Sequence, residues 1–69
     1  MSILPSTYIL RQPVQHRVTL IEGGVEISYI GRTYDNYYPD GLLTRYVSPE
    51  SHDRESFPIV GCYLIEELA

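Results

Sequence analysis

The sequence contains very little cysteine or histidine: Cys62 is the only thiol, and His16 and His52 are the only imidazoles. One cysteine excludes an internal disulfide, and these three side chains are too few for a four-ligand structural zinc site. We expect no metal and no cofactor. A small domain without such supports often gains stability by association, because a subunit interface buries apolar surface that its own core cannot. We therefore expect a homo-oligomer or a protein partner.

Lysine, tryptophan and long apolar runs are absent as well. No segment approaches the ~20 apolar residues of a transmembrane helix. The first five residues also lack the basic start and apolar stretch of a secretory signal. We expect a cytoplasmic protein that does not bind membranes. With 69 residues and a net charge of −4, residues 1–69 are a single small domain, too short for a dinucleotide-binding fold or an α/β barrel.

The clearest pattern that is present is a β-hairpin around Gly23-Gly24. Residues of high β-propensity flank this pair, and two adjacent glycines accept the positive φ angles of a two-residue hairpin turn. The register that pairs Glu22 with Val25 groups four apolar side chains on one face, namely Val18, Leu20, Ile27 and Tyr29. The opposite face carries both polar and apolar side chains. This pattern predicts an antiparallel hairpin with one side on the core.

A second hairpin is predicted around Pro39-Asp40-Gly41. Proline presets φ for a type I turn, and Gly41 suits the left-handed position that follows it. The resulting register pairs Tyr38 with Leu42, Tyr37 with Leu43, Asp35 with Arg45, and Tyr34 with Tyr46. One register therefore predicts both an ion pair, Asp35 with Arg45, and an aromatic pair, Tyr34 with Tyr46. Gly31 is expected to mark a bulge or bend where one long strand leaves the first hairpin and starts the second.

The rest of the chain suggests two more strands and a loop. Residues 48–56 are polar and predict a solvated loop, with room for one helical turn that Ser48 would cap. Residues 57–65 regain β composition, and residues 6–12 form a short strand closed by Pro13. The sequence thus predicts an all-β, mainly antiparallel fold, a five-stranded meander or small open barrel. Its two terminal strands must pair with each other, be covered, or pair across a subunit boundary.

Catalytic and ligand-binding signals are weak. Ser51-His52-Asp53 has the residue types of a hydrolytic triad, but three consecutive loop residues cannot converge on one reacting atom. Cys62 stands in an apolar segment, where a buried, unreactive thiol is expected. Gly23-Gly24 leads into a strand, so no helix N-terminus is available to bind phosphate. We therefore expect a protein without enzymatic activity.

The strongest candidate site is rich in tyrosine and arginine. All five cations of the chain are arginines, seven of its eight aromatic residues are tyrosines, and six of these residues fall between positions 32 and 46. Both residue types are enriched in the binding hot spots of protein interfaces. The predicted partner-binding residues are Arg32, Tyr34, Tyr37, Tyr38, Arg45 and Tyr46. Tyrosines that fill a half-buried face of the sheet are the alternative.

Three functions fit this pattern. The first, which we favour, is a noncatalytic protein-interaction module: an inhibitor, an accessory subunit or a homo-oligomeric small β protein. The second is a small β-barrel that binds single-stranded nucleic acid, which the five dispersed arginines and nine acids disfavour. The third is an acidic decoy for a basic protein surface, suggested by the net charge and by Glu50, Asp53 and Glu55.

Overall fold

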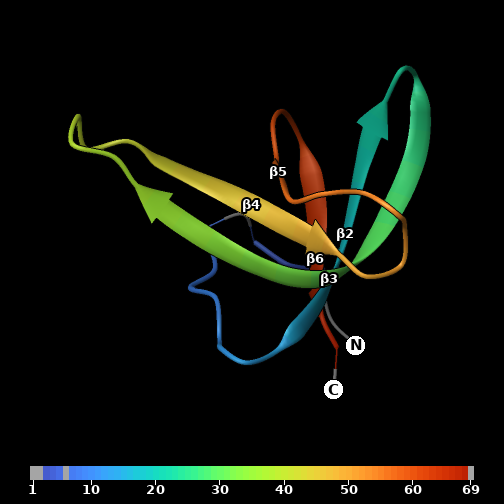
Figure 1. The fold of residues 1–69 in the computed structure, drawn as a ribbon, viewed down its shortest axis with the longest axis horizontal. Coiled ribbons are helices and arrows are strands. Elements are labelled where there is room, and N and C mark those ends of the chain that lie inside the picture. The colour runs from blue at the N-terminus through green and yellow to red at the C-terminus, as the bar shows by residue number, and fades with distance from the viewer. Residues whose placement is uncertain (1–2, 6, 69) are drawn as a thin grey trace.

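The computed structural model describes residues 3–5 and 7–68, and this part of the chain contains six strands and no helix. The strands are β1 (Ile3–Leu4), β2 (Gln15–Glu22), β3 (Val25–Tyr37), β4 (Leu43–Pro49), β5 (Phe57–Pro58) and β6 (Tyr63–Glu67). They form one open antiparallel sheet in the order β1-β6-β2-β3-β4-β5 (Figure 1). The predicted all-β fold is confirmed, with six strands instead of five. None of the described residues forms a helix with the length and apolar character needed to cross a bilayer.

The first predicted hairpin is confirmed pair by pair. β2 and β3 pair Glu22 with Val25, and every pair from there to Arg17 and Ile30 has the predicted register. The two turn glycines adopt φ angles of 58° and 78°, values that cost a residue with a side chain about 1–2 kcal/mol. The apolar face of this hairpin is the one that is buried.

The second predicted hairpin is also confirmed. The Tyr38 N–H donates to the Leu42 carbonyl over 2.9 Å, and Gly41 adopts a φ of 85°. The Asp40 carboxylate accepts the Leu42 N–H over 3.0 Å and so fixes the turn. The remaining predicted pairs are all present: Tyr37 with Leu43, Asp35 with Arg45, and Tyr34 with Tyr46.

A single curved strand, β3, serves both hairpins and passes through Gly31 (Figure 1). A Cβ atom at Gly31 would lie 2.1 Å from the backbone oxygen of Ser48. Only glycine allows the β4 backbone to approach this closely. Gly31 thus lies, as predicted, where one long strand passes from the first hairpin to the second, and the pairing continues through it without the bulge that was the other expectation.

The predicted strand over residues 6–12 is wrong for residues 7–12, and Ser6 lies outside the described residues. The Tyr8 N–H donates to the Pro5 carbonyl over 2.9 Å, so the chain turns after β1. Residues 7–12 then run without strand pairing, and Gln12 reaches β3 only through its side-chain amide, which donates to the Thr33 carbonyl over 2.6 Å. The N-terminal strand is instead the two-residue β1, which pairs with β6.

The predicted strand over residues 57–65 is divided in two by a bend at Gly61, where φ is 78°. Cys62 lies in this bend and is exposed, so its predicted burial within a strand is wrong. The helical turn considered for residues 48–56 is absent from the structure, because the β3–β4 ladder continues through the Gly31–Pro49 pair and includes Ser48. Residues 50–56 form the predicted exposed loop.

The strand order departs from a simple meander at β6. β2, β3, β4 and β5 follow each other in the sheet, but β6 lies beyond β2. A flat sheet would separate β5 from β6 by four strand spacings, about 19 Å. Residues 59–62 join them with five Cα steps, which span at most about 18 Å. The sheet curls accordingly, because Arg45 of β4 reaches the Tyr63 hydroxyl of β6 over 3.3 Å although β2 and β3 lie between these strands, and one core cluster joins both halves.

The core lies inside this curl and is small. Its buried hydrophobic residues come from β2, β3, β4, β6 and the β5–β6 connection: Val18, Leu20, Tyr29, Val47, Ile59 and Ile65. The two edge strands, β1 and β5, have only two residues each. Such short edge strands limit edge-to-edge aggregation.

Candidate functional site

The end of the second hairpin projects from the body of the sheet as a two-stranded ribbon (Figure 1). Pairing between β2 and β3 stops at Gln15 and Arg32, and β5 pairs only with Tyr46 and Val47 of β4. Between these limits β3 and β4 pair only with each other. We call residues 34–46, up to the first β4 residue that pairs with β5, the projecting hairpin. A two-stranded ribbon is only marginally stable by itself. The order of this hairpin therefore depends on the contacts that other segments make with its side chains.

The predicted site residues lie on both faces of this hairpin. Side chains alternate along a strand, and the register places Tyr34 opposite Tyr46 on one face and Asp35 opposite Arg45 on the other. Tyr37, two residues beyond Asp35, shares the second face. We call the first group, with the hydroxyl of Tyr38 reaching it, the tyrosine face: Arg32, Tyr34, Tyr38 and Tyr46.

The tyrosine face is ordered by its own contacts. The rings of Tyr34 and Tyr46 stack with centroids 5.2 Å apart and planes 2° from parallel. The hydroxyls of Tyr38 and Tyr46 lie 2.7 Å apart, and the Tyr34 hydroxyl lies 2.6 Å from Ser56 Oγ. The hydrogen bond with Tyr38, followed by partial desolvation, raises the pKa of the Tyr46 phenol above its ordinary value. The face therefore presents neutral hydroxyls on a stiff aromatic surface.

Arg45 is buried, with 7% of its surface exposed. Its guanidinium donates to both oxygens of Asp35, Nε to Oδ1 over 2.8 Å and Nη2 to Oδ2 over 3.1 Å. It also donates to the Tyr8 carbonyl over 2.7 Å and to the Tyr63 hydroxyl over 3.3 Å. The hydrogen bond with Asp35 raises the pKa of Arg45 against the opposing effect of burial, and Tyr63 adds to the rise. Arg45 thus ties the projecting hairpin to the N-terminal segment and β6, whereas Arg32 is exposed.

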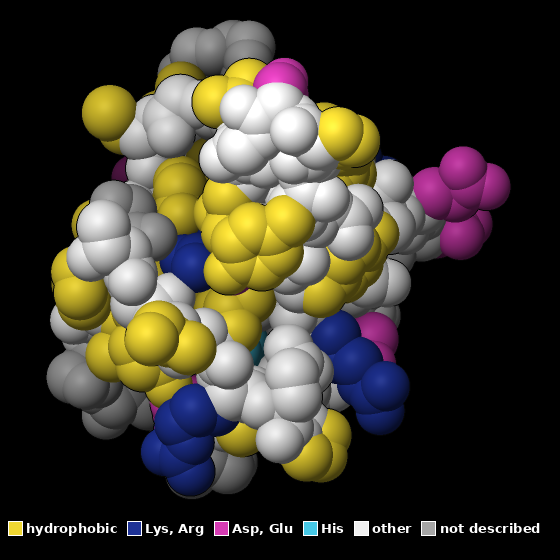
Figure 2. All heavy atoms as spheres, turned by 90° about the vertical axis from the view of Figure 1, so that its left-hand side faces the viewer, with side chains coloured by type: hydrophobic (Ala, Val, Ile, Leu, Met, Phe, Trp, Pro, Cys, Tyr) yellow, Lys and Arg dark blue, Asp and Glu magenta, His cyan; other side chains and the backbone are white. Residues whose placement is uncertain are grey.

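The tip of the projecting hairpin is apolar and exposed. Tyr37 is 78% exposed, Leu42 64% and Leu43 44%. Figure 2 views the molecule from this end and shows hydrophobic side chains gathered over it, with few charged groups among them. We call Tyr37, Leu42 and Leu43 the apolar tip. Leu42 and Leu43 were not among the site residues predicted from the sequence, although their place directly after a predicted turn was a usable signal.

Two shallow grooves flank the projecting hairpin on the side of the N-terminal segment. One, of about 320 Å³, lies between Ile9–Gln12 and β3, and the other, of about 300 Å³, continues past Tyr8 toward Leu43. Ile9 stands at the rim of both and is 85% exposed. These grooves extend the exposed apolar surface beyond the apolar tip.

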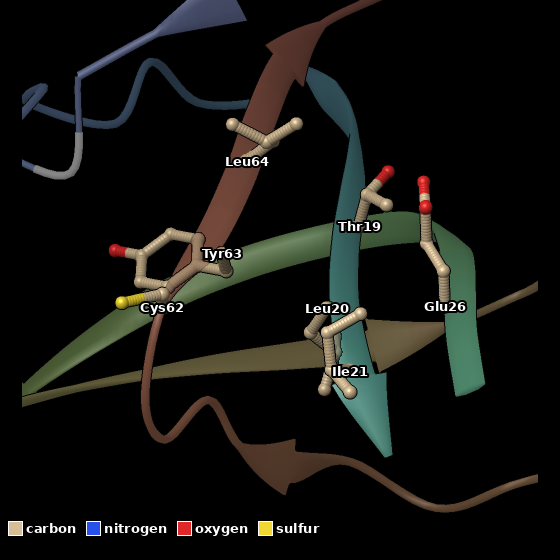
Figure 3. Close-up of a pocket in the computed structure, with 7 residues that line it drawn as sticks. All are labelled: Thr19, Leu20, Ile21, Glu26, Cys62, Tyr63 and Leu64. Carbon is tan, nitrogen blue, oxygen red and sulfur yellow. The ribbon is translucent and has the colours of Figure 1, made fainter. Parts of the chain in front are cut away.

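A third depression, of about 240 Å³, lies on the outer face of β2 and β6 and is lined by Ile21, Leu64 and Cys62 among others. In Figure 3 the Cys62 side chain points away from Thr19 and Ile21. The one carboxylate among the lining residues, Glu26, lies on the far side of the hollow from the thiol (Figure 3), so the hollow lacks the close pairing that activates a cysteine nucleophile.

His52 and Ser51 hydrogen-bond to each other over 2.9 Å, and the His52 ring lies 4.7 Å from that of Tyr29. This loop packs on the first hairpin, and Asp53 makes no hydrogen bond with His52 among the described contacts. Within residues 3–5 and 7–68, no three His, Cys, Asp or Glu side chains lie close enough to hold a metal ion.

Comparison with protein-family models, with curated proteins and with solved structures found no match for this chain.

Proposed function

We propose that this chain is a noncatalytic protein-interaction module that binds a partner protein through the projecting hairpin. The observation that carries the proposal is the exposure of aromatic and aliphatic side chains at the apolar tip, next to the ordered tyrosine face. The stacked and hydrogen-bonded tyrosines of the tyrosine face are already in place, so they lose little entropy when a partner covers them. The surface thus has the features of a binding hot spot.

The free energy of burying the apolar tip is consistent with binding of a partner protein. Full burial of a Leu or aromatic side chain contributes about 1.5–3 kcal/mol, so covering the exposed parts of the three apolar-tip residues offsets part of the cost of association. Their burial within the same chain would require another layer of structure, and the described residues provide none. A partner protein, or a second copy of the chain, supplies that layer.

Nucleic-acid binding has less support than protein binding. Four of the five arginines are in ion pairs, with Glu67, Glu66, Asp35 and Glu22. Arg32 is the one arginine without an ion pair in the part of the chain that the structure describes. Phosphate binding draws its affinity from several free cations on one face, and a single arginine beside the tyrosine face does not provide them.

The test is capture of partners from a lysate of the source organism, with identification by mass spectrometry. We expect at least one protein to bind the wild-type chain and to be lost with Tyr37→Ala combined with Tyr38→Ala, whose far-ultraviolet spectrum and melting cooperativity stay unchanged. Ile21→Ala is the matched control, because Ile21 is an exposed aliphatic residue (62%) on a different surface. Equal capture by wild type, double variant and control would contradict the proposal, as would unfolding of the double variant.

A further inference from the structure

The direction of the backbone groups along the projecting hairpin follows from its closing pair. The Tyr38 N–H donates to the Leu42 carbonyl, so this pair is a hydrogen-bonded one. Hydrogen-bonded and non-hydrogen-bonded pairs alternate in an antiparallel ladder. The N–H and C=O groups of Tyr37 and of Asp35 therefore point away from β4, toward the other edge of β3.

Two observed hydrogen bonds agree with this direction. On β3, the Thr33 carbonyl, two residues before Asp35, points to that edge and accepts the Gln12 side-chain amide. On β4, the Arg45 carbonyl points to the opposite edge and accepts the Ile59 N–H over 2.8 Å. In both strands, the odd-numbered residues are therefore the ones whose backbone N–H and C=O groups point away from the paired strand.

Among residues 3–5 and 7–68, no strand pairs with the β3 edge beyond Arg32, where pairing with β2 stops. In the described part of the chain, the outward N–H and C=O groups of Asp35 and Tyr37 form no hydrogen bond. Residues 9–12 run along this edge but reach it only through Gln12. Four backbone groups in a row, with strand spacing, are therefore available.

Apolar surface lies directly beside these groups. The groove of about 320 Å³ along the edge is lined by Ile9, Leu10, Gln12, Tyr34, Asp35 and Tyr37. A row of free donors and acceptors is satisfied by an extended backbone, and a groove beside it receives alternate side chains of that backbone.

We propose that the edge of β3 at Asp35 and Tyr37 accepts an extended peptide segment of the partner protein as an additional strand, with a large apolar side chain seated between Ile9 and Tyr37. This inference rests on the proposed function and specifies how the partner is recognised. The net charge of −4 favours a segment with a positive net charge over a second copy of this chain. The far edge of β4 is a poorer site, because the Arg45 carbonyl is already occupied.

The test compares two substitutions at one position. Tyr37→Ala removes the side chain and keeps the N–H donor, whereas Tyr37→Pro removes both. Proline is tolerated at an edge position whose N–H is unpaired, and Tyr37 is the last residue of β3. Asn36→Pro is the control that should unfold the hairpin, because the Asn36 N–H points toward β4 by the same alternation.

The probes are short linear peptides selected from a random displayed library against the wild-type chain. We expect the selected peptides to bind Tyr37→Pro at least about tenfold more weakly than Tyr37→Ala, because the added strand loses a hydrogen bond and meets the proline ring. Should Tyr37→Pro prove unstable, amide hydrogen exchange of the wild-type complex gives the answer. Bound peptide must then slow exchange at Asp35 and Tyr37.

Three results would overturn the strand-addition proposal. They are equal affinity for Tyr37→Pro and Tyr37→Ala, slowed exchange confined to other strands, and a wild-type dimer that Tyr37→Pro dissociates, which would make a second copy the occupant. If Tyr37→Pro captures the lysate partner as well as Tyr37→Ala does, while the Tyr37→Ala, Tyr38→Ala double variant loses it, only the strand addition fails. If the double variant also keeps the partner, the proposed function fails.

Discussion

Replacement of Arg45 by methionine should destabilise the fold severely, because it leaves the Asp35 carboxylate without its partner at a site where the two side chains are only 7% and 16% exposed. Breaking a buried ion pair by removal of one member costs about 3–5 kcal/mol. A chain of 69 residues has a total stability of about 3–10 kcal/mol at the usual ~0.05–0.15 kcal/mol per residue. Arg45→Met should therefore remove at least about 30% of the free energy of unfolding.

Urea unfolding followed by far-ultraviolet circular dichroism measures this loss. Arg17→Met is the matched control, because Arg17 and Glu66 form a longer, more exposed pair at 3.5 Å with 34% and 20% exposure. This pair is half-buried but open to water at Arg17, and ion pairs that water reaches contribute about 0–1 kcal/mol. We expect a loss of about 3 kcal/mol or more for Arg45→Met and below about 1 kcal/mol for Arg17→Met. Equal, small losses for both variants would refute the buried position of Arg45.

Two further predictions concern the core. Burial lowers the pKa of the His16 imidazole, against an opposing effect of Glu67 and with a supporting one of Arg45. The unfolded chain then binds the proton first, so the free energy of unfolding should fall as pH drops below ~6.5, the ordinary histidine value. Urea unfolding between pH 7.5 and pH 5 should show that the free energy of unfolding depends less on pH in His16→Gln than in the wild type. An equal pH dependence in both proteins would contradict this prediction. Gly31→Ala should lower the melting temperature by several degrees or more, because its Cβ would meet backbone oxygen at 2.1 Å, and wild-type-like melting would contradict the close approach at Gly31.

The two hairpins could be predicted from the sequence because their determinants are local. Gly23-Gly24 and Pro39-Asp40-Gly41 specify turns, and period-two patterning then fixes the register of every residue pair that follows. The ends of the chain could not be predicted in this way. The position of β6 beside β2 depends on pairing between residues about 45 positions apart, and no local pattern in residues 57–67 encodes it.

The candidate site was predicted only in part, for a related reason. The correct register already placed Asp35 and Arg45 together and put Tyr34 on the opposite face. Both faces of the second hairpin are mixed in polarity, however, so the pattern did not indicate which one is buried. The curl of the sheet decides this, because it brings Tyr63 and the N-terminal segment onto Arg45. The exposure of Leu42 and Ile9 likewise follows from tertiary arrangement.

Amide hydrogen exchange across the whole chain, free and bound to a partner captured from the lysate, tests the central claim most directly. If the projecting hairpin is the contact surface, the partner should slow exchange within residues 34–46 and leave the first hairpin, residues 17–30, unchanged. Slowed exchange in the first hairpin or at β1 and β5, with residues 34–46 unaffected, would contradict the account.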